Sequence, residues 1–160
     1  MNILMKSTLV AALAVSAATG VAIADGHADK ALKAAIKARQ ANMQVIAYHT
    51  GILGGIAKGE IAYDAAMATA AAENLHAAAA MHRGLLWTEG SAQGSVEGTR
   101  ADPKIWSDAA GFEEKAMALE TAAEAMIAAA GQDQAAVGAA MAGIGGGCKG
   151  CHDNYRGPEN

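Results

Sequence analysis

The chain has 160 residues, a length within the roughly 100–200 residues of one domain, and 52% of them are hydrophobic while 18% are charged. Its formal net charge of −4 disfavours broad nucleic-acid binding, because such binding depends on cations placed against phosphates. The 43 Ala and only two Pro favour long helices and leave little room for a sheet. The few aromatic residues, 4% of the chain, predict that a bulky group from outside the polypeptide completes the core.

The first 24 residues have the pattern of a secretory signal peptide. Lys6 supplies a positive start, residues 8–18 are apolar or small, and Ala22-Ile23-Ala24 has the small-x-small form of a cleavage site. The apolar run is shorter than the about 20 residues that span a bilayer, so we expect no membrane anchor after cleavage. Residues 25–160 would then form one exported domain, in a compartment where disulfides persist.

Hydrophobic periodicity predicts four helices in this domain, over residues 28–58, 64–82, 102–130 and 133–155. Residues suited to begin a helix stand at the starts of the last three: Asp64, Asp102-Pro103 and Asp133. Two connections are short, and the third, residues 84–101, is a long loop rich in Gly and Ser. Three of the helices keep an average apolar spacing of 3.5 residues, which predicts an all-α fold, an antiparallel four-helix bundle.

Three consecutive glycines at residues 145–147 weaken the fourth helix, each by about 1 kcal/mol relative to Ala. Two interpretations stay open for them. Either the helix breaks at this point, or a flat ligand approaches the backbone closely there.

The residues directly after these glycines carry the most specific motif of the chain. Cys148-Lys149-Gly150-Cys151-His152 is a C-x-x-C-H sequence, the attachment signature of c-type haem. On a helix, Cys148 and Cys151 share a face, so both sulfurs reach the vinyl groups on one edge of a porphyrin. His152 then lies under the iron as its proximal axial ligand. We therefore predict one covalent haem c per chain.

Three other interpretations of the two cysteines compete with haem. A thioredoxin-like redox pair belongs near a βαβ pattern, which the sequence lacks. A zinc site needs a fourth ligand, and the other histidines show no ligand spacing beside the motif. A simple disulfide leaves His152 and the small aromatic volume unexplained.

At this point the chain resembles the class II cytochromes c, the family that includes cytochrome c′ and its low-spin relatives. The resemblance covers nearly all of the mature chain and rests on these segments: Arg39-Gln40-Ala41-Asn42-Met43, Ala57-Lys58-Gly59-Glu60 with Tyr63-Asp64, Pro103-Lys104-Ile105-Trp106, and residues 148–156. It implies a left-handed four-helix bundle with one covalent haem, commonly a homodimer, in the bacterial periplasm.

Arg39 stands on the apolar stripe of the first helix, where an unpaired buried guanidinium would be costly. A haem propionate is the candidate anion, because Arg binds carboxylates through a planar fork. An ion pair with Glu113 or Glu120, or a side chain that reaches out to solvent, stays as the alternative. The resemblance supports a place for Arg39 beside the haem and extends it to Gln40.

Met43 lies one turn after Arg39 and separates two predictions of function. Without a haem it would be ordinary core filling. With one, its thioether is a candidate distal axial ligand, and the main prediction is a single-electron carrier with a His152/Met43-ligated haem, served by periplasmic redox partner proteins. The alternative is a five-coordinate cytochrome c′ that binds NO or CO, with Met43 as a steric gate.

Neither prediction makes the protein an enzyme. The sequence offers no carboxylate pair, no nucleophile with a matching base and no open polar cleft that would support turnover.

Overall fold

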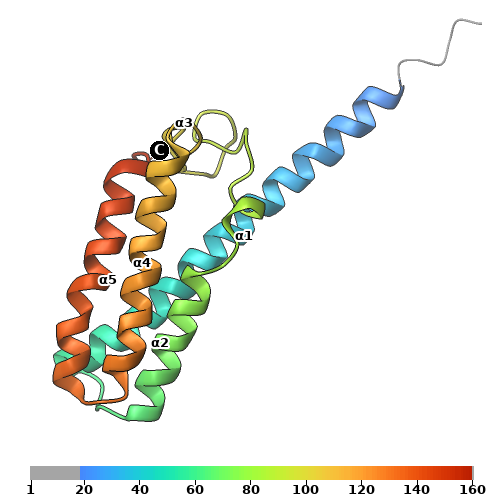
Figure 1. The fold of residues 1–160 in the computed structure, drawn as a ribbon. Helices are drawn as coiled ribbons and strands as arrows, with labels where there is room; N and C mark the ends of the chain where they lie inside the picture. Colours follow the sequence, from blue (N-terminus) through green and yellow to red (C-terminus); the bar gives the residue numbers. More distant parts are fainter. Residues whose placement is uncertain (1–18, 160) are drawn as a thin grey trace, which may run out of the picture.

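The computed structural model describes residues 19–159, with side chains from residue 28 onward, and its architecture is a bundle of four long helices (Figure 1). These are α1 (Thr19–Lys58), α2 (Ala65–Ala79), α4 (Ala109–Ala130) and α5 (Gln134–Tyr155). A 3-10 turn, η1 (Arg83–Leu85), and a short helix, α3 (Lys104–Ser107), lie in the long connection between α2 and α4. Helices α1 and α4 each pack against both α2 and α5, and neighbouring helices run in opposite directions (Figure 1). The predicted fold is confirmed.

Helix α1 is longer than the sequence pattern predicts. It begins at Thr19 rather than at residue 28, and its first part projects away from the bundle (Figure 1). It ends at Lys58 as predicted, because Gly59 adopts a φ of 75° that favours glycine. Of the predicted signal peptide, residues 1–18 lie outside the described residues and residues 19–24 belong to α1. Within the described part of the chain, no helix has an apolar stretch long enough to cross a membrane.

Aspartate side chains begin the other three long helices. Asp64 accepts a hydrogen bond from the Met67 amide, and Asp133 accepts one from the Ala136 amide, so both predicted caps are confirmed. Helix α2 ends at Ala79, three residues before the predicted end at His82.

The predicted third helix is two helices, because the backbone breaks at Asp108. This residue has a φ of −132°, which is not helical, and its carboxylate caps α4 by accepting a hydrogen bond from the Gly111 amide at 3.3 Å. Pro103 is the N-cap residue of the short α3, and the Asp102 carboxylate just before it accepts a hydrogen bond from the Lys104 amide at 2.8 Å. The break gives α4 a start of its own beside the end of α5.

Small side chains let the helices approach one another closely. Helix α2 contributes mainly buried alanines to the core, and larger side chains from the other helices fill the remaining space. The largest fully buried apolar residues are Leu53, Ile56, Leu75, Met126, Ile144 and Val137.

The glycines at residues 145–147 do not interrupt α5, so the first of the two open interpretations, a helix break, is wrong. At Gly147 a Cβ atom would lie 3.0 Å from the Cα atom of Leu119 on α4, whereas nothing lies within 4 Å of such an atom at Gly145 or Gly146. One of the three glycines therefore permits a close approach, and the approaching group is the backbone of α4.

Candidate functional site

The last turns of α5 bring the three residues of the C-x-x-C-H motif to one pocket. Cys148, Cys151 and His152 are each partly buried and line a pocket of about 1200 Å³ between α1, α4, α5 and the long connection. Both thiols are free, so they do not form the disulfide considered above. The pocket is large enough for a cofactor, since ligand pockets usually measure about 300–1,000 Å³.

The environment of these side chains keeps all three uncharged at neutral pH. Burial raises the pKa of the Cys148 thiol, and burial together with the neighbouring Cys148 raises the pKa of the Cys151 thiol. Burial lowers the pKa of His152, and the cations of Arg156 and Arg100 lower it further. A neutral imidazole keeps a lone pair for a metal, and free thiols at i and i+3 are the groups that attach to vinyls. The donor set therefore fits a covalent haem.

Aromatic side chains form one wall of the pocket beside Cys151. The ring centroids of Trp87 and Phe112 lie 5.0 Å apart, and those of Phe112 and Tyr155 lie 5.5 Å apart, both pairs edge-on. The Trp106 indole fixes this wall by donating a hydrogen bond to the Trp87 carbonyl at 3.1 Å. The wall is apolar and rigid, which suits a flat macrocycle.

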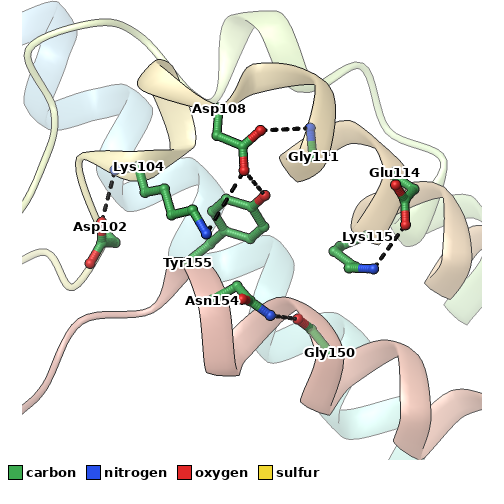
Figure 2. Close-up of polar contacts among 9 residues, drawn as sticks. All are labelled: Asp102, Lys104, Asp108, Gly111, Glu114, Lys115, Gly150, Asn154 and Tyr155. Atoms are coloured by element: carbon green, nitrogen blue, oxygen red, sulfur yellow. Dashed lines mark hydrogen bonds and ion pairs between the residues drawn. The ribbon is translucent and has the colours of Figure 1, made fainter.

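Tyr155 also takes part in a polar cluster at the end of α5. Its hydroxyl donates a hydrogen bond to Asp108 Oδ2 at 2.8 Å, and the ammonium of Lys104 lies 3.9 Å from the same oxygen (Figure 2). This hydrogen bond is the largest cause that lowers the pKa of Asp108, while burial and the nearby carboxylate raise the pKa of Tyr155 to about 12. The cluster ties the turn that carries His152 to the start of α4.

Arg39 is buried as predicted, with only 3% of its surface exposed, but its hydrogen-bond partners are neutral. The guanidinium donates to the Ser91 hydroxyl and to the Ser91 carbonyl, at 2.6 and 2.7 Å, and to the Thr99 hydroxyl at 2.7 Å. Burial lowers the pKa of Arg39. The alternative ion pair is wrong, because Glu113 and Glu120 bind Arg83.

Gln40 and Met43 line the same pocket as the C-x-x-C-H motif, and Met43 is more exposed than its place on the apolar stripe predicts. The Gln40 amide donates a hydrogen bond to the Gly98 carbonyl at 2.6 Å. Met43 keeps 39% of its surface exposed. Met43 therefore lines the pocket as a partly exposed side chain and does not belong to the packed core.

Sequence reasoning missed Ser91, Thr99 and the Asp108 cluster. Ser91 and Thr99 meet Arg39 across 52 and 60 residues of chain, and no local pattern marks such a contact. Asp108 left a usable signal, since Asp directly before a helical stretch is a favoured N-cap residue.

Comparisons with known proteins show which family the chain is similar to. The profile of the family described as Cytochrome C′ matches residues 34–156. Cytochrome c-554 of Cereibacter sphaeroides is 42% identical over 76% of this chain and 91% of the relative. Cytochrome c′ of the same species is 36% identical over 76% of this chain and 81% of the relative.

Two solved structures extend the comparison to three dimensions. Cytochrome c′ from Rhodobacter Spheriodes has a TM-score of 0.77 at 38% identity, covering 80% of this chain and 98% of that one. A nitric oxide complex of a point mutant of cytochrome c prime from Alcaligenes xylosoxidans has a TM-score of 0.70 at 35% identity, covering 79% and 97%.

These comparisons overturn the main functional prediction, a single-electron carrier with a His152/Met43-ligated haem. Several of the relatives are cytochromes c′, and one of the matching structures holds nitric oxide. A diatomic ligand occupies the axial position that a permanent methionine ligand would fill, so the two arrangements exclude each other.

Proposed function

Because this chain belongs to the cytochrome c′ family, we propose that it is a five-coordinate c-type cytochrome that binds nitric oxide or carbon monoxide. Its cofactor is the covalent haem c of the family. One observation carries the proposal: Cys148, Cys151 and His152 from α5 line the same pocket as Met43 from α1.

In this proposal the residues of α5 hold the cofactor. The thiols of Cys148 and Cys151 would form the two thioether bonds, and the neutral imidazole of His152 would bind the iron. When bound, the haem would supply an iron atom able to take up a diatomic gas. Tyr155 and its aromatic neighbours pack beside the Cys151 attachment and keep water away from that side.

Helix α1 supplies the other part of the site. Met43 acts as a steric gate over the gas-binding position, because it lines the pocket with a flexible apolar side chain. Arg39 and Gln40 belong to the haem environment, where the buried cation of Arg39 offsets the negative charge of the propionates.

The protein acts in the periplasm in this proposal. Residues 1–24 are its signal peptide and residues 25–160 its mature domain, in keeping with the small-x-small sequence at residues 22–24. Attachment of haem at a C-x-x-C-H motif takes place after export, so location and cofactor are consistent with each other.

Retention of the haem tests the attachment residues. Protein from a host with c-type maturation machinery should keep its colour after acid-acetone extraction, and Cys148→Ala with Cys151→Ala should abolish this. Lys149→Ala, between the two cysteines, is the matched control and should keep the colour. Colour lost from the unmutated protein would contradict the attachment.

Gas binding tests the function. The reduced protein should have a high-spin spectrum and bind CO, and Met43→Ala should speed CO association several-fold because the gate is smaller. Met117→Ala, a change at an exposed methionine of α4, should have no effect. A low-spin reduced protein that takes up no CO would contradict the proposal.

We also propose that two copies associate through the outer face of α1. Val45 and Tyr48 are exposed there to 44% and 67%, and they lie three residues apart on the same face of the helix. Tyr48→Asp should turn a sedimenting dimer into a monomer at equal concentration. An unmutated holoprotein that remains monomeric at every concentration would rule this face out.

A further inference from the structure

The loop between α2 and α3 is bound to α1 by side chains that the proposed function assigns to the haem environment. We call residues 86–101 the strap. Arg39 and Gln40 both donate hydrogen bonds to it, Arg39 near both of its ends and Gln40 to the Gly98 carbonyl. None of these hydrogen bonds joins α1 to another helix of the bundle.

The contact between Arg39 and the strap is a fork that only a guanidinium makes. Nη1 donates to the Ser91 hydroxyl and, at 3.4 Å, to the Leu86 carbonyl, while Nη2 donates to the Ser91 carbonyl and the Thr99 hydroxyl. The carbon of the guanidinium lies 4.8 Å from the centre of the Trp87 ring. All four N–H bonds of the two terminal nitrogens therefore point into the strap.

These hydrogen bonds lie in the interior of the protein, where losing them would cost stability. Ser91 has no exposed surface, and Arg39 and Thr99 each expose only 3%. A buried guanidinium that lost its acceptors would keep its charge without hydrogen bonds, which is strongly unfavourable. The strap and Arg39 thus hold each other in place, even though the strap has no regular secondary structure.

The far end of the strap is bound to the chain after α5. Arg100 and Gly157 exchange two hydrogen bonds, from Nε of Arg100 at 2.8 Å and from the Gly157 amide at 2.7 Å. The Asp102 amide, just beyond the strap, donates to the Tyr155 carbonyl at 3.0 Å. The strap therefore connects the helix of Met43 with the end of the helix that carries His152.

Residues at both ends of the strap line the pocket: Leu86, Trp87, Gly98, Thr99, Arg100 and Ala101. From this arrangement we propose that Arg39 is a positioning residue that holds the strap as a wall of the pocket, and that the strap controls entry of the diatomic ligand. The inference rests on the proposed function for the nature of that ligand. The charge of Arg39 acts on the haem, and its hydrogen bonds act on the strap.

Two variants separate these roles of Arg39. Arg39→Lys keeps the positive charge, but one ammonium cannot bridge Ser91 and Thr99 as a fork does. Ser91→Ala with Thr99→Val leaves Arg39 intact and removes both hydroxyl acceptors, together with the bonds that these hydroxyls make inside the strap to the Thr88 carbonyl and the Ala101 amide. An effect common to this variant and to Arg39→Lys is therefore the one that reports the contact with Arg39. Lys37→Gln is the matched control, because Lys37 is an exposed cation on the same helix two residues away.

The experiment measures strap opening and gas entry on the same haem-loaded proteins. A Glu-specific protease reports opening, since Glu89 and Glu97 are exposed positions within the strap. CO association after flash photolysis reports entry. We expect Arg39→Lys and the Ser91/Thr99 double variant each to raise the cleavage rate by about tenfold and the CO rate several-fold, with Lys37→Gln unchanged.

A cleavage rate in the Ser91/Thr99 double variant equal to that of the unmutated protein would overturn the positioning role. The double variant also provides this test if Arg39→Lys does not fold. Faster cleavage with an unchanged CO rate would overturn control of entry by the strap. An unmutated protein that binds no CO contradicts the proposed function alone, because the cleavage rates still decide whether Arg39 holds the strap.

Discussion

Gly147 is the residue at which the packing of two helices depends most directly on a missing side chain. A Cβ atom there would lie 3.0 Å from the Leu119 Cα atom, and neither backbone can move without separating α4 from α5. We expect Gly147→Ala to lower the free energy of unfolding by about 1–3 kcal/mol, as overpacking does. Urea denaturation of the holoprotein measures the change.

Gly146→Ala is the control for that variant, because it adds the same atom one residue earlier, where nothing lies within 4 Å. It should raise the free energy of unfolding by up to about 1 kcal/mol through helix propensity alone. Equal effects of the two variants would show that contact with α4 does not limit residue 147.

The Asp108–Tyr155 pair makes a pH-dependent contribution to stability. Because the hydrogen bond from Tyr155 holds the pKa of Asp108 below its ordinary value of 3.8, the pair stabilises the fold above that pH. This contribution is lost as the pH falls through the lowered pKa of the folded state. At the alkaline end, the pKa of Tyr155 is raised to about 12, so the contribution is lost as the pH rises toward that value.

Tyr155→Phe removes the hydroxyl and keeps the ring in the aromatic wall. The variant should be less stable than the unmutated protein at pH 7, and the difference should shrink as the pH falls below 3.8. Urea unfolding between pH 7 and pH 3 measures it. A difference that is the same at every pH would mean that the hydroxyl does not act through the Asp108 carboxylate.

At the scale of whole elements, α5 depends on the Asp133 cap at its first turn, far along the helix from the C-x-x-C-H motif near its end. Asp133 accepts the Ala136 amide at 2.8 Å, so Asp133→Ala should lower the free energy of unfolding by about 1 kcal/mol. Asp133→Ser keeps an acceptor and should be close to neutral. Thermal melting followed by circular dichroism distinguishes them, and a loss equal in both variants would argue against the cap.

The break between α3 and α4 is the clearest case in which a tertiary contact changed an element. The sequence from residue 102 to residue 130 is continuous in its helical pattern, apart from Pro103 near its start. The carboxylate of Asp108 binds the Gly111 amide and the Tyr155 hydroxyl together. The second bond comes from a residue 47 positions away, and periodicity contains no information about it.

At the scale of the molecule, a pocket of about 1200 Å³ runs along α1 from Arg39 to Lys58, and the small side chains of the 43 alanines leave this volume unfilled. Protein without haem, made with Cys148→Ala and Cys151→Ala, should therefore lose fixed tertiary packing while it keeps helical structure. Near-ultraviolet circular dichroism and the cooperativity of melting measure this. A well-dispersed NMR spectrum with melting close to that of the holoprotein would contradict it.

By itself the sequence determined the fold class and the composition of the haem-attachment motif. Helical periods, aspartate caps and the C-x-x-C-H spacing are local, because each depends on residues within about four positions of one another. For the same reason Arg39 could be predicted as buried and in need of partners, since its place on an apolar stripe is a property of one helix.

Only the tertiary structure decided which residues bind Arg39 and which helix surfaces pack together. Ser91 and Thr99 reach Arg39, Asp108 reaches Tyr155, and the α4 backbone reaches Gly147 across long stretches of chain. The 39% exposure of Met43 is likewise a property of the folded protein, because its place on the apolar stripe of one helix predicts a buried side chain. Such contacts depend on the angles at which whole helices cross, and the same apolar stripes along a sequence are compatible with several crossing angles.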